Sequence, residues 1–215
     1  MRRLIVVAML AAAAARPVRA QIGPMPRGPF TSQPQYWVGL SYGYLAGTTI
    51  VQDAEIWDFA YTSQIRATLE KAVQRDFTIG VSAGFANASL NASVDHPVPA
   101  GVCATNCPET AEITQLLAFV NGGSGAIGFH ALYNLEAGLT QFANFRDAST
   151  GTRGSISATD FTFGLGGGIG YRISPLADAY VSEQGDFILD SPAPGTTQSN
   201  APRQFTFRVG FRYGF

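Results

Sequence analysis

The last stretch of the chain, Phe205-Thr206-Phe207-Arg208-Val209-Gly210-Phe211-Arg212-Tyr213-Gly214-Phe215, decides the fold. Its odd positions are all large and apolar, whereas its even positions are Thr, Arg or Gly. Strict alternation with a period of two is typical of a β-strand whose two faces meet different environments. Because the apolar face ends in alternate aromatic side chains, Phe211, Tyr213 and Phe215, the segment favours contact with lipid.

The same alternation recurs upstream, in residues 36–44, 57–70, 77–86, 127–140 and 160–172. Each segment puts large apolar side chains on one face and small or polar side chains on the other. Two further segments, 113–121 and 179–189, have the composition of strands. We therefore predict an all-β protein, an eight-stranded antiparallel up-and-down transmembrane β-barrel over residues 36–215.

Two of these strands are harder to orient. Segment 113–121 alternates poorly, so the pattern does not assign its faces. Segment 179–189 becomes irregular around Glu183 and Gly185, where we expect a β-bulge to reset the register.

The connections favour a membrane barrel, although composition alone leaves a soluble β-sandwich open. Short links at residues 72–76, 122–126 and 174–178 alternate with long links at residues 46–55, 87–112, 146–157 and 190–202. Outer-membrane barrels have short periplasmic turns and longer outer loops. An even number of strands then places both ends of the barrel on the periplasmic side.

The first residues predict export. Met1-Arg2-Arg3 is followed by an apolar run from Leu4 to Ala15 and by a small-residue cleavage pattern that ends at Ala20. This order is typical of a secretory signal peptide, and the apolar run is too short to span a bilayer as a helix. We expect a signal peptide over residues 1–20, then a Pro- and Gly-rich flexible leader over residues 21–35.

Removal of the signal peptide makes the chain acidic. The whole chain has 14 Lys+Arg and 15 Asp+Glu, and the signal peptide holds four arginines, which leaves 14 − 4 = 10 basic residues and a formal charge of 10 − 15 = −5. This charge argues against nucleic acid as a partner. We expect a monomer in contact with outer-membrane lipids, and the sequence identifies no extracellular partner.

The two faces of the strands have different roles. Aromatic side chains on the apolar face are candidates for interfacial girdles: Tyr42, Tyr44, Trp57, Tyr61, Phe161, Tyr171, Tyr213 and Phe215. The lumen of an eight-stranded barrel is just wide enough to be filled by side chains. Its predicted charged residues are Arg66, Glu70, Glu136, Arg172, Arg208 and Arg212, with His130, Asp58 and Asp160 at other levels.

Charges of both signs in a narrow lumen predict a plug of ion pairs, because unpaired buried charges are costly. For Arg208 and Arg212 we expect acidic partners among Glu70, Glu136 and Glu183. A narrow channel for ions or small solutes is the alternative, since the glycines of segment 160–172 could leave room for water. The sequence does not decide between these two hypotheses.

Cys103 and Cys107 lie in Cys-Ala-Thr-Asn-Cys-Pro. An exported protein meets an oxidising compartment, so we predict a local disulfide between them. Zinc binding would need further ligands, and only His96 and Glu109 are near in sequence. We therefore expect neither a metal site nor a cofactor.

Two motifs indicate enzymatic alternatives, and neither is complete. The stretch Gly123-Ser124-Gly125-Ala126-Ile127-Gly128 matches a dinucleotide-binding fingerprint, but a strand follows where the fingerprint needs a helix. A lipid-modifying barrel would require a His-x-Ser pair, and neither His96 nor His130 has that serine. We therefore predict that the protein is not an enzyme.

The terminal Phe215 with alternate aromatics, the signal peptide and the strand pattern of residues 36–215 resemble the small outer-membrane barrel families. These are the opacity, attachment-invasion and OmpA-transmembrane-domain types of the porin-like barrels. The resemblance implies a location in the bacterial outer membrane, and recognition of Phe211, Tyr213 and Phe215 by the β-barrel assembly machinery. It also implies a structural or surface-interaction role.

Overall fold

In a computed structural model, the barrel is described for residues 34–52, 55–74, 76–94, 107–123, 127–148, 150–153, 157–189 and 203–215. The predicted signal peptide, most of the predicted leader, His96 and Cys103 lie outside these residues. Within the described ranges, no helix is long and apolar enough to cross a membrane.

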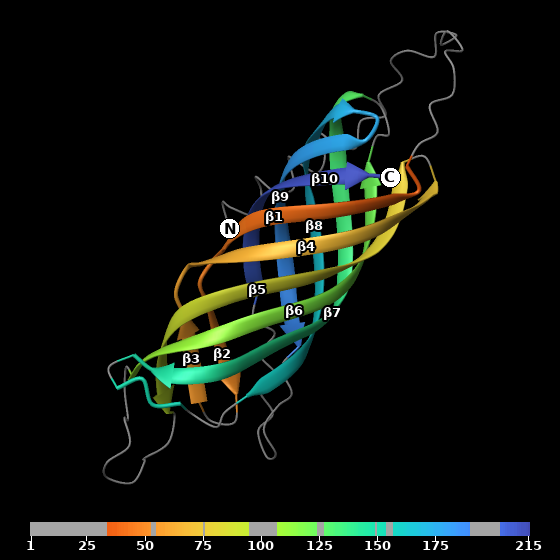
Figure 1. The fold of residues 1–215 in the computed structure, drawn as a ribbon. Coiled ribbons are helices and arrows are strands. Elements are labelled where there is room, and N and C mark those ends of the chain that lie inside the picture. The colour runs from red at the N-terminus through yellow and green to blue at the C-terminus, as the bar shows by residue number, and fades with distance from the viewer. Residues whose placement is uncertain are drawn as a thin grey trace, which may run out of the picture. The chain divides into compact units, whose positions relative to one another are not determined.

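Eight antiparallel strands form a closed barrel (Figure 1). Around the wall they are β1 (Tyr36–Leu45), β4 (Thr62–Gln74), β5 (Phe77–Val94), β6 (Cys107–Gly123), β7 (Gly128–Asp147), β8 (Ala158–Ser174), β9 (Ala177–Leu189) and β10 (Arg203–Gly214). Because β1 pairs with both β4 and β10, and β5 pairs with both β4 and β6, each barrel strand has two partners. The predicted fold class is confirmed.

The first and last strands close the barrel through backbone hydrogen bonds. The Tyr36 amide donates to the Phe215 carbonyl at 3.1 Å, and the Phe215 amide donates to the Tyr36 carbonyl at 2.9 Å. The two rings also stack on the outside, with centroids 6.0 Å apart. We call the end of the barrel with Tyr36 and Phe215 the inner end, and the opposite end the outer end.

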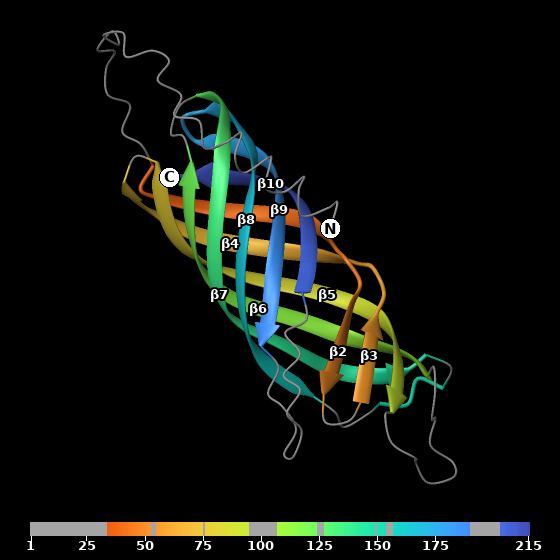
Figure 2. The same cartoon turned by 180° about the vertical axis from the view of Figure 1, so that it is seen from behind.

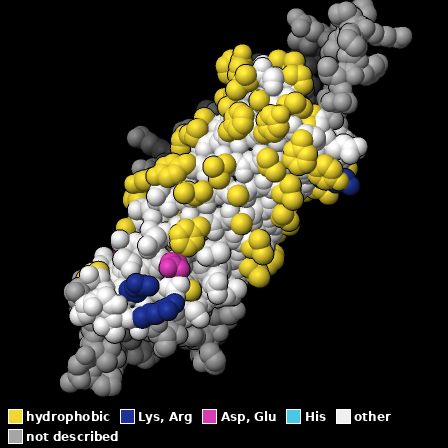
Figure 3. All heavy atoms as spheres, in the orientation of Figure 1, with side chains coloured by type: hydrophobic (Ala, Val, Ile, Leu, Met, Phe, Trp, Pro, Cys, Tyr) yellow, Lys and Arg dark blue, Asp and Glu magenta, His cyan; other side chains and the backbone are white. Residues whose placement is uncertain are grey.

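An apolar belt surrounds the wall next to the inner end. Figure 3 shows it as a broad field of hydrophobic side chains that gives way to polar ones towards the outer end. Aromatic pairs mark both margins, Tyr36–Phe215 and Phe129–Tyr171 at the inner one, Tyr44–Tyr61 and Phe163–Phe187 at the outer one. Phe205 and Phe215 are 215 − 205 = 10 residues apart, which in a tilted strand is roughly 25 Å, the height of a lipid-facing band.

The predicted loop after β1 is instead a hairpin of β2 (Thr48–Gln52) and β3 (Glu55–Phe59), which pairs with the outer part of β5. The alternation breaks between β3 and β4, where the Ala60 amide donates to the Ser89 carbonyl at 2.8 Å. Trp57 and Phe59 are therefore buried, although Tyr61 and the apolar face of β4 point outwards.

Two predictions that assumed one unbroken strand here are wrong. Trp57 is 2% exposed and does not belong to a lipid-facing girdle. Asp58 is exposed on the outer face, where it accepts a hydrogen bond from the Thr49 hydroxyl at 3.0 Å, so it does not face the lumen.

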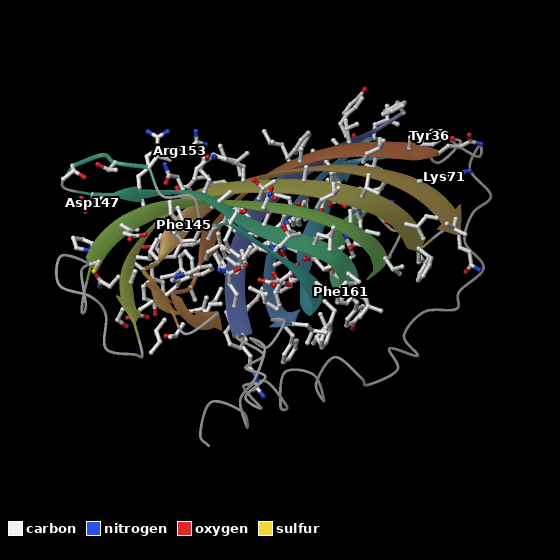
Figure 4. All side chains as sticks on the ribbon, turned by 90° about the horizontal axis from the view of Figure 1, so that it is seen from below. Tyr36, Lys71, Phe145, Asp147, Arg153 and Phe161 are labelled. Atoms are coloured by element: carbon white, nitrogen blue, oxygen red, sulfur yellow. The ribbon has the colours of Figure 1, made fainter. Side chains whose placement is uncertain are left out.

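At the outer end, β5, β6 and β7 continue well beyond the apolar belt (Figure 4, where Asp147 and Arg153 lie at this end and Tyr36 and Lys71 at the other). The predicted long loop 87–112 is thus mostly strand, and only residues 95–106 of it lie outside the described part. The faces are inverted here, since Asn87, Ser89 and Asn91 point outwards while Ala88 and Leu90 are buried.

The inverted faces enclose an apolar plug. Its members are Leu45, Ile50, Trp57, Phe59, Ala86, Ala88, Leu90, Ala111, Ile113, Phe142, Phe145, Ala158 and Ile188. A β-bulge in β7 supplies one of them: Asn144 has a φ of 56°, and the extra residue turns Phe145 inwards against the Trp57 ring, 4.7 Å away.

The two strands that the sequence did not orient now have clear faces. In β6 the inward residues include Leu117 and Phe119, while Leu116 faces outwards. Both faces are apolar, so the alternation is hidden. In β9 the register with β8 and β10 is continuous through Glu183 and Gly185, so the expected bulge is absent from this strand.

Replacing the buried Trp57 by Ala should destabilise the folded barrel by about 3–5 kcal/mol, because it leaves a large cavity in the plug. Tyr61→Ala, which removes an exposed ring just before β4, is the matched control and should cost clearly less. Urea-dependent unfolding in lipid vesicles measures both. Equal losses would contradict the inward placement of Trp57.

Candidate functional site in the barrel lumen

The six predicted lumen charges are all buried inside the barrel. They are Arg66, Glu70, Glu136, Arg172, Arg208 and Arg212, each at most 7% exposed. They come from β4, β7, β8 and β10, where alternate residues point inwards. The structure adds charged residues that the sequence analysis did not place in this group, notably Asp178 and Asp186 of β9.

Near the inner end, Arg212 bridges two carboxylates. Its Nη1 lies 3.2 Å from Glu70 Oε2, and its Nη2 and Nε lie 2.6 and 2.9 Å from Asp178 Oδ2. Glu70 also accepts a hydrogen bond from the Thr78 hydroxyl at 2.7 Å. Since both acids belong to strands that do not neighbour each other, the guanidinium ties β4 to β9 across the lumen.

Two more basic side chains lie close to Asp178. His130 Nε2 lies 3.2 Å from Asp178 Oδ2, and Arg172 Nη2 lies 4.0 Å from the same oxygen. The guanidinium carbons of Arg172 and Arg212 are each 5.1 Å from the centroid of a Trp37 ring. We call Glu70, Arg172, Asp178 and Arg212, with His130 and Trp37, the inner layer.

A second layer of polar contacts lies nearer the outer end. Arg66 Nη1 donates to Glu136 Oε2 and Oε1 at 2.8 and 3.0 Å, and Arg66 Nη2 donates to Gln115 Oε1 at 2.8 Å. Gln64 Nε2 donates to the same Gln115 oxygen at 2.7 Å. This middle layer connects β4, β6 and β7, so it also crosses the lumen.

Arg208 completes the middle layer in an unexpected way. Its Nη1 donates to Gln184 Oε1, and Gln184 Nε2 donates to Asp186 Oδ1 at 2.6 Å. The expected partner Glu183 is on the outer face of β9, so that expectation is wrong. Extending a period of two unbroken through β9 would have placed Asp178, Gln184 and Asp186 inside.

Neighbouring side chains fill the space beside three inward-facing glycines. A Cβ at Gly164 would overlap the Asp186 carboxylate, one at Gly170 the His130 ring, and one at Gly210 the Tyr180 ring. Each glycine thus gives a large side chain on the next strand room to lie flat against the wall. These positions do not form an open path.

Two small cavities remain between the side chains. One, of about 60 Å³, lies between the two layers and is bordered by Glu70, Glu136, Tyr180, Arg208 and Arg212 among others. The other, of about 30 Å³, lies at the inner mouth beside Trp37, Arg172 and Arg212. Each is large enough for only a few water molecules.

The other sequence candidates are placed as follows. Phe211, Tyr213 and Phe215 point outwards from the inner end of β10. Cys107 begins β6, and because Cys103 is outside the described residues their disulfide stays a prediction. Among the described residues, no group of three or more His, Cys, Asp or Glu side chains could hold a metal ion.

Comparison with solved structures supports this architecture. Neisserial surface protein A is 12% identical and matches 84% of this chain and 97% of its own, with a TM-score of 0.59. The attachment invasion locus protein Ail of Yersinia pestis, at 13% identity, matches 84% and 99% with a TM-score of 0.46. The N-terminal β-barrel domain of Pseudomonas aeruginosa OprF, also at 13% identity, matches 85% and 100% with a TM-score of 0.45.

The first of these similarities establishes the fold, that of a small outer-membrane β-barrel. No protein-family profile and no curated protein sequence matches the chain. The outer-membrane location predicted from the sequence agrees with this fold and with the apolar belt.

Arg66→Met should destabilise the barrel by about 3–5 kcal/mol, because it leaves the buried Glu136 carboxylate without its charge partner. The double variant Arg66→Met/Glu136→Met should recover most of that loss, since no uncompensated charge remains. Urea titration of the refolded variants measures the coupling. Strictly additive losses would show that the two side chains do not act as a pair.

Proposed function

We propose that this small eight-stranded barrel of the outer-membrane type is a closed membrane anchor with a structural or surface-interaction role, and not an open channel or an enzyme. In this proposal the apolar belt sits in lipid. The part of the barrel where β5, β6 and β7 continue beyond the belt, which we call the outer extension, stands in water outside the membrane. The supporting observation is that two different kinds of packing block the lumen in series.

The first block is the apolar plug in the outer extension. Phe142 packs against the Trp57 ring at 6.3 Å and the Phe59 ring at 5.3 Å between centroids, and all three side chains are at most 3% exposed. A hydrated ion would have to displace these contacts and lose its own water. The plug lies where the outer wall is polar, so burial of its apolar surface from water stabilises it.

The second block consists of the inner and middle layers. Arg212 and Arg66 each reach across the lumen to acids on other strands, with contacts of 2.6–3.2 Å. Moving either guanidinium aside would leave a buried carboxylate unpaired, which is strongly destabilising. The ion-pair plug expected from the sequence is therefore part of the proposed seal.

The outer extension offers a surface for contacts outside the cell. Its outward residues on β5 and the neighbouring strands are mostly uncharged and polar, such as Asn87, Ser89, Asn91 and Thr114. A rigid sheet that presents amide and hydroxyl groups suits hydrogen-bonded recognition better than charge-driven recognition. At the inner end, the exposed Phe211, Tyr213 and Phe215 suit recognition by the barrel assembly machinery.

A narrow channel is the second candidate, because the two cavities adjoin. Arg212, Asn121 and Leu132 border both of them. If the Arg212 guanidinium swung away from Glu70 and Asp178, the inner mouth would open into the central cavity. The apolar plug would still close the path beyond.

Planar-bilayer recording of the refolded protein decides between these functions. The closed anchor predicts no reproducible stepwise current in concentrated potassium chloride, since neither block opens without loss of packing. The control is a known porin refolded and inserted by the same procedure. Stepwise currents that disappear in the Arg172→Ala or Glu136→Gln variant would contradict the closed anchor and support the channel.

A further inference from the structure

Arg208 differs from the other arginines of the lumen. It projects inwards from β10, which runs between β1 and β9 (Figure 2), and is 5% exposed. Arg66, Arg172 and Arg212 each lie within 4.0 Å of a carboxylate oxygen, whereas Arg208 forms no ion pair with any residue that the structure describes. Its hydrogen-bond partner there is the neutral amide of Gln184. A buried guanidinium keeps its charge, so the lack of a counter-charge is costly.

One edge of the Arg208 guanidinium has the geometry that binds anions. Nη1 donates to Gln184 Oε1, but Nε and Nη2 are buried and make no hydrogen bond within the described part of the chain. The N–H groups of Nε and Nη2 point from the same edge of the planar guanidinium and can hold one acceptor between them. Asp186 does not take this place, because the Gln184 amide separates the two side chains and donates from Nε2 to Asp186 Oδ1 at 2.6 Å.

Arg208 borders the central cavity, which lies between the two layers and has a volume of about 60 Å³. The charged lining of this cavity consists of three arginines and two glutamates: Arg66, Arg208, Arg212, Glu70 and Glu136. The formal charge of the lining is thus 3 − 2 = +1, and the two glutamates already accept hydrogen bonds from Arg66 and Arg212. An excess of positive charge around a small enclosed volume favours an anion. The volume holds one ion of the size of chloride with a few water molecules at most.

Hydroxyl groups near Arg208 add neutral donors to the lining. Ser182 is the register partner of Arg208 on β9, and Tyr180 lies against Gly210, where a Cβ would overlap its ring. Both hydroxyl side chains border the cavity. A hydroxyl group can rotate to donate to the acceptor that is present, so these groups are compatible with an anion. Gly43 on β1 leaves space for the Arg208 stem, since a Cβ there would lie 2.8 Å from Arg208 Cγ.

From the unpaired guanidinium edge and the cavity that Arg208 borders, we propose that the lumen binds one small monovalent anion of the size of chloride, with Arg208 as its main ligand. The anion accepts hydrogen bonds from Arg208 Nε and Nη2 and neutralises the one lumen arginine that has no carboxylate beside it. Because packed side chains surround the cavity, the anion is taken up as the barrel folds. It stabilises the folded state and leaves the lumen closed.

Urea unfolding of the full-length barrel at a series of sodium chloride concentrations tests the proposal. Sodium gluconate keeps the ionic strength constant, because gluconate is too large for the cavity. The protein is refolded into phosphatidylcholine vesicles in each salt mixture, so that the anion can enter. If the folded state binds one anion, a tenfold rise in chloride should raise the ratio of folded to unfolded protein by up to about tenfold.

Arg208→Met removes the ligand and should abolish the chloride dependence. The matched control is Arg203→Met, which removes an exposed arginine at the start of the same strand and should keep the full dependence. General effects of the salt act on both variants alike. A wild-type protein without chloride dependence, or the same dependence in Arg208→Met, would overturn the anion site and assign the cavity to water.

Bromide gives a second test that needs no variant. Crystals of the wild-type protein grown in sodium bromide should show an anomalous-scattering peak in the central cavity, beside Arg208 Nε and Nη2. A cavity without this peak would contradict the proposal even if the Arg208→Met variant failed to fold.

Discussion

The hydrogen-bonded closure of β1 on β10 is the constraint on which the rest of the structure depends. Lipid offers no partner for a backbone amide or carbonyl, so a sheet in a membrane must have no open edge. The register from Trp37–Gly214 to Leu45–Thr206, extended by the reciprocal Tyr36–Phe215 bonds, meets this need. Once the sheet is closed, each strand has one face towards lipid and one towards a lumen only wide enough for side chains.

The narrowness of the lumen explains why the polar side chains that line it are paired. Polar residues of the lipid-spanning part must face inwards, and there they have to satisfy one another. Arg212 does so with two acids and Arg66 with an acid and an amide. Glycines on neighbouring strands provide the space, as Gly170 does for His130. A strand such as β8 is rich in glycine because its neighbours fill the lumen, and not because the lumen is empty.

The sequence predicts the strands best where the two faces differ most. From Phe205 onwards every second residue of β10 is apolar, and β4 has Ile65, Ala67 and Leu69 on one face; both strands have the predicted faces. In β6, Leu116 and Leu117 point in opposite directions, so periodicity carries no information. If the alternation is counted back from β4, Trp57 and Phe59 belong to its lipid-facing row. The alternation is interrupted between β3 and β4, however, and both side chains are buried. Such a break depends on pairing with β5, which is a tertiary contact.

The inversion of faces along β5 locates the edge of the membrane by physical chemistry alone. On the inner side of this edge the wall faces lipid and not water. Burying an apolar side chain in the lumen there gains little, so the interior can be polar. On the outer side of this edge water wets the wall, and the hydrophobic effect drives residues such as Leu90 and Phe145 into the lumen. The apolar plug therefore forms only in the part of the barrel that stands outside lipid.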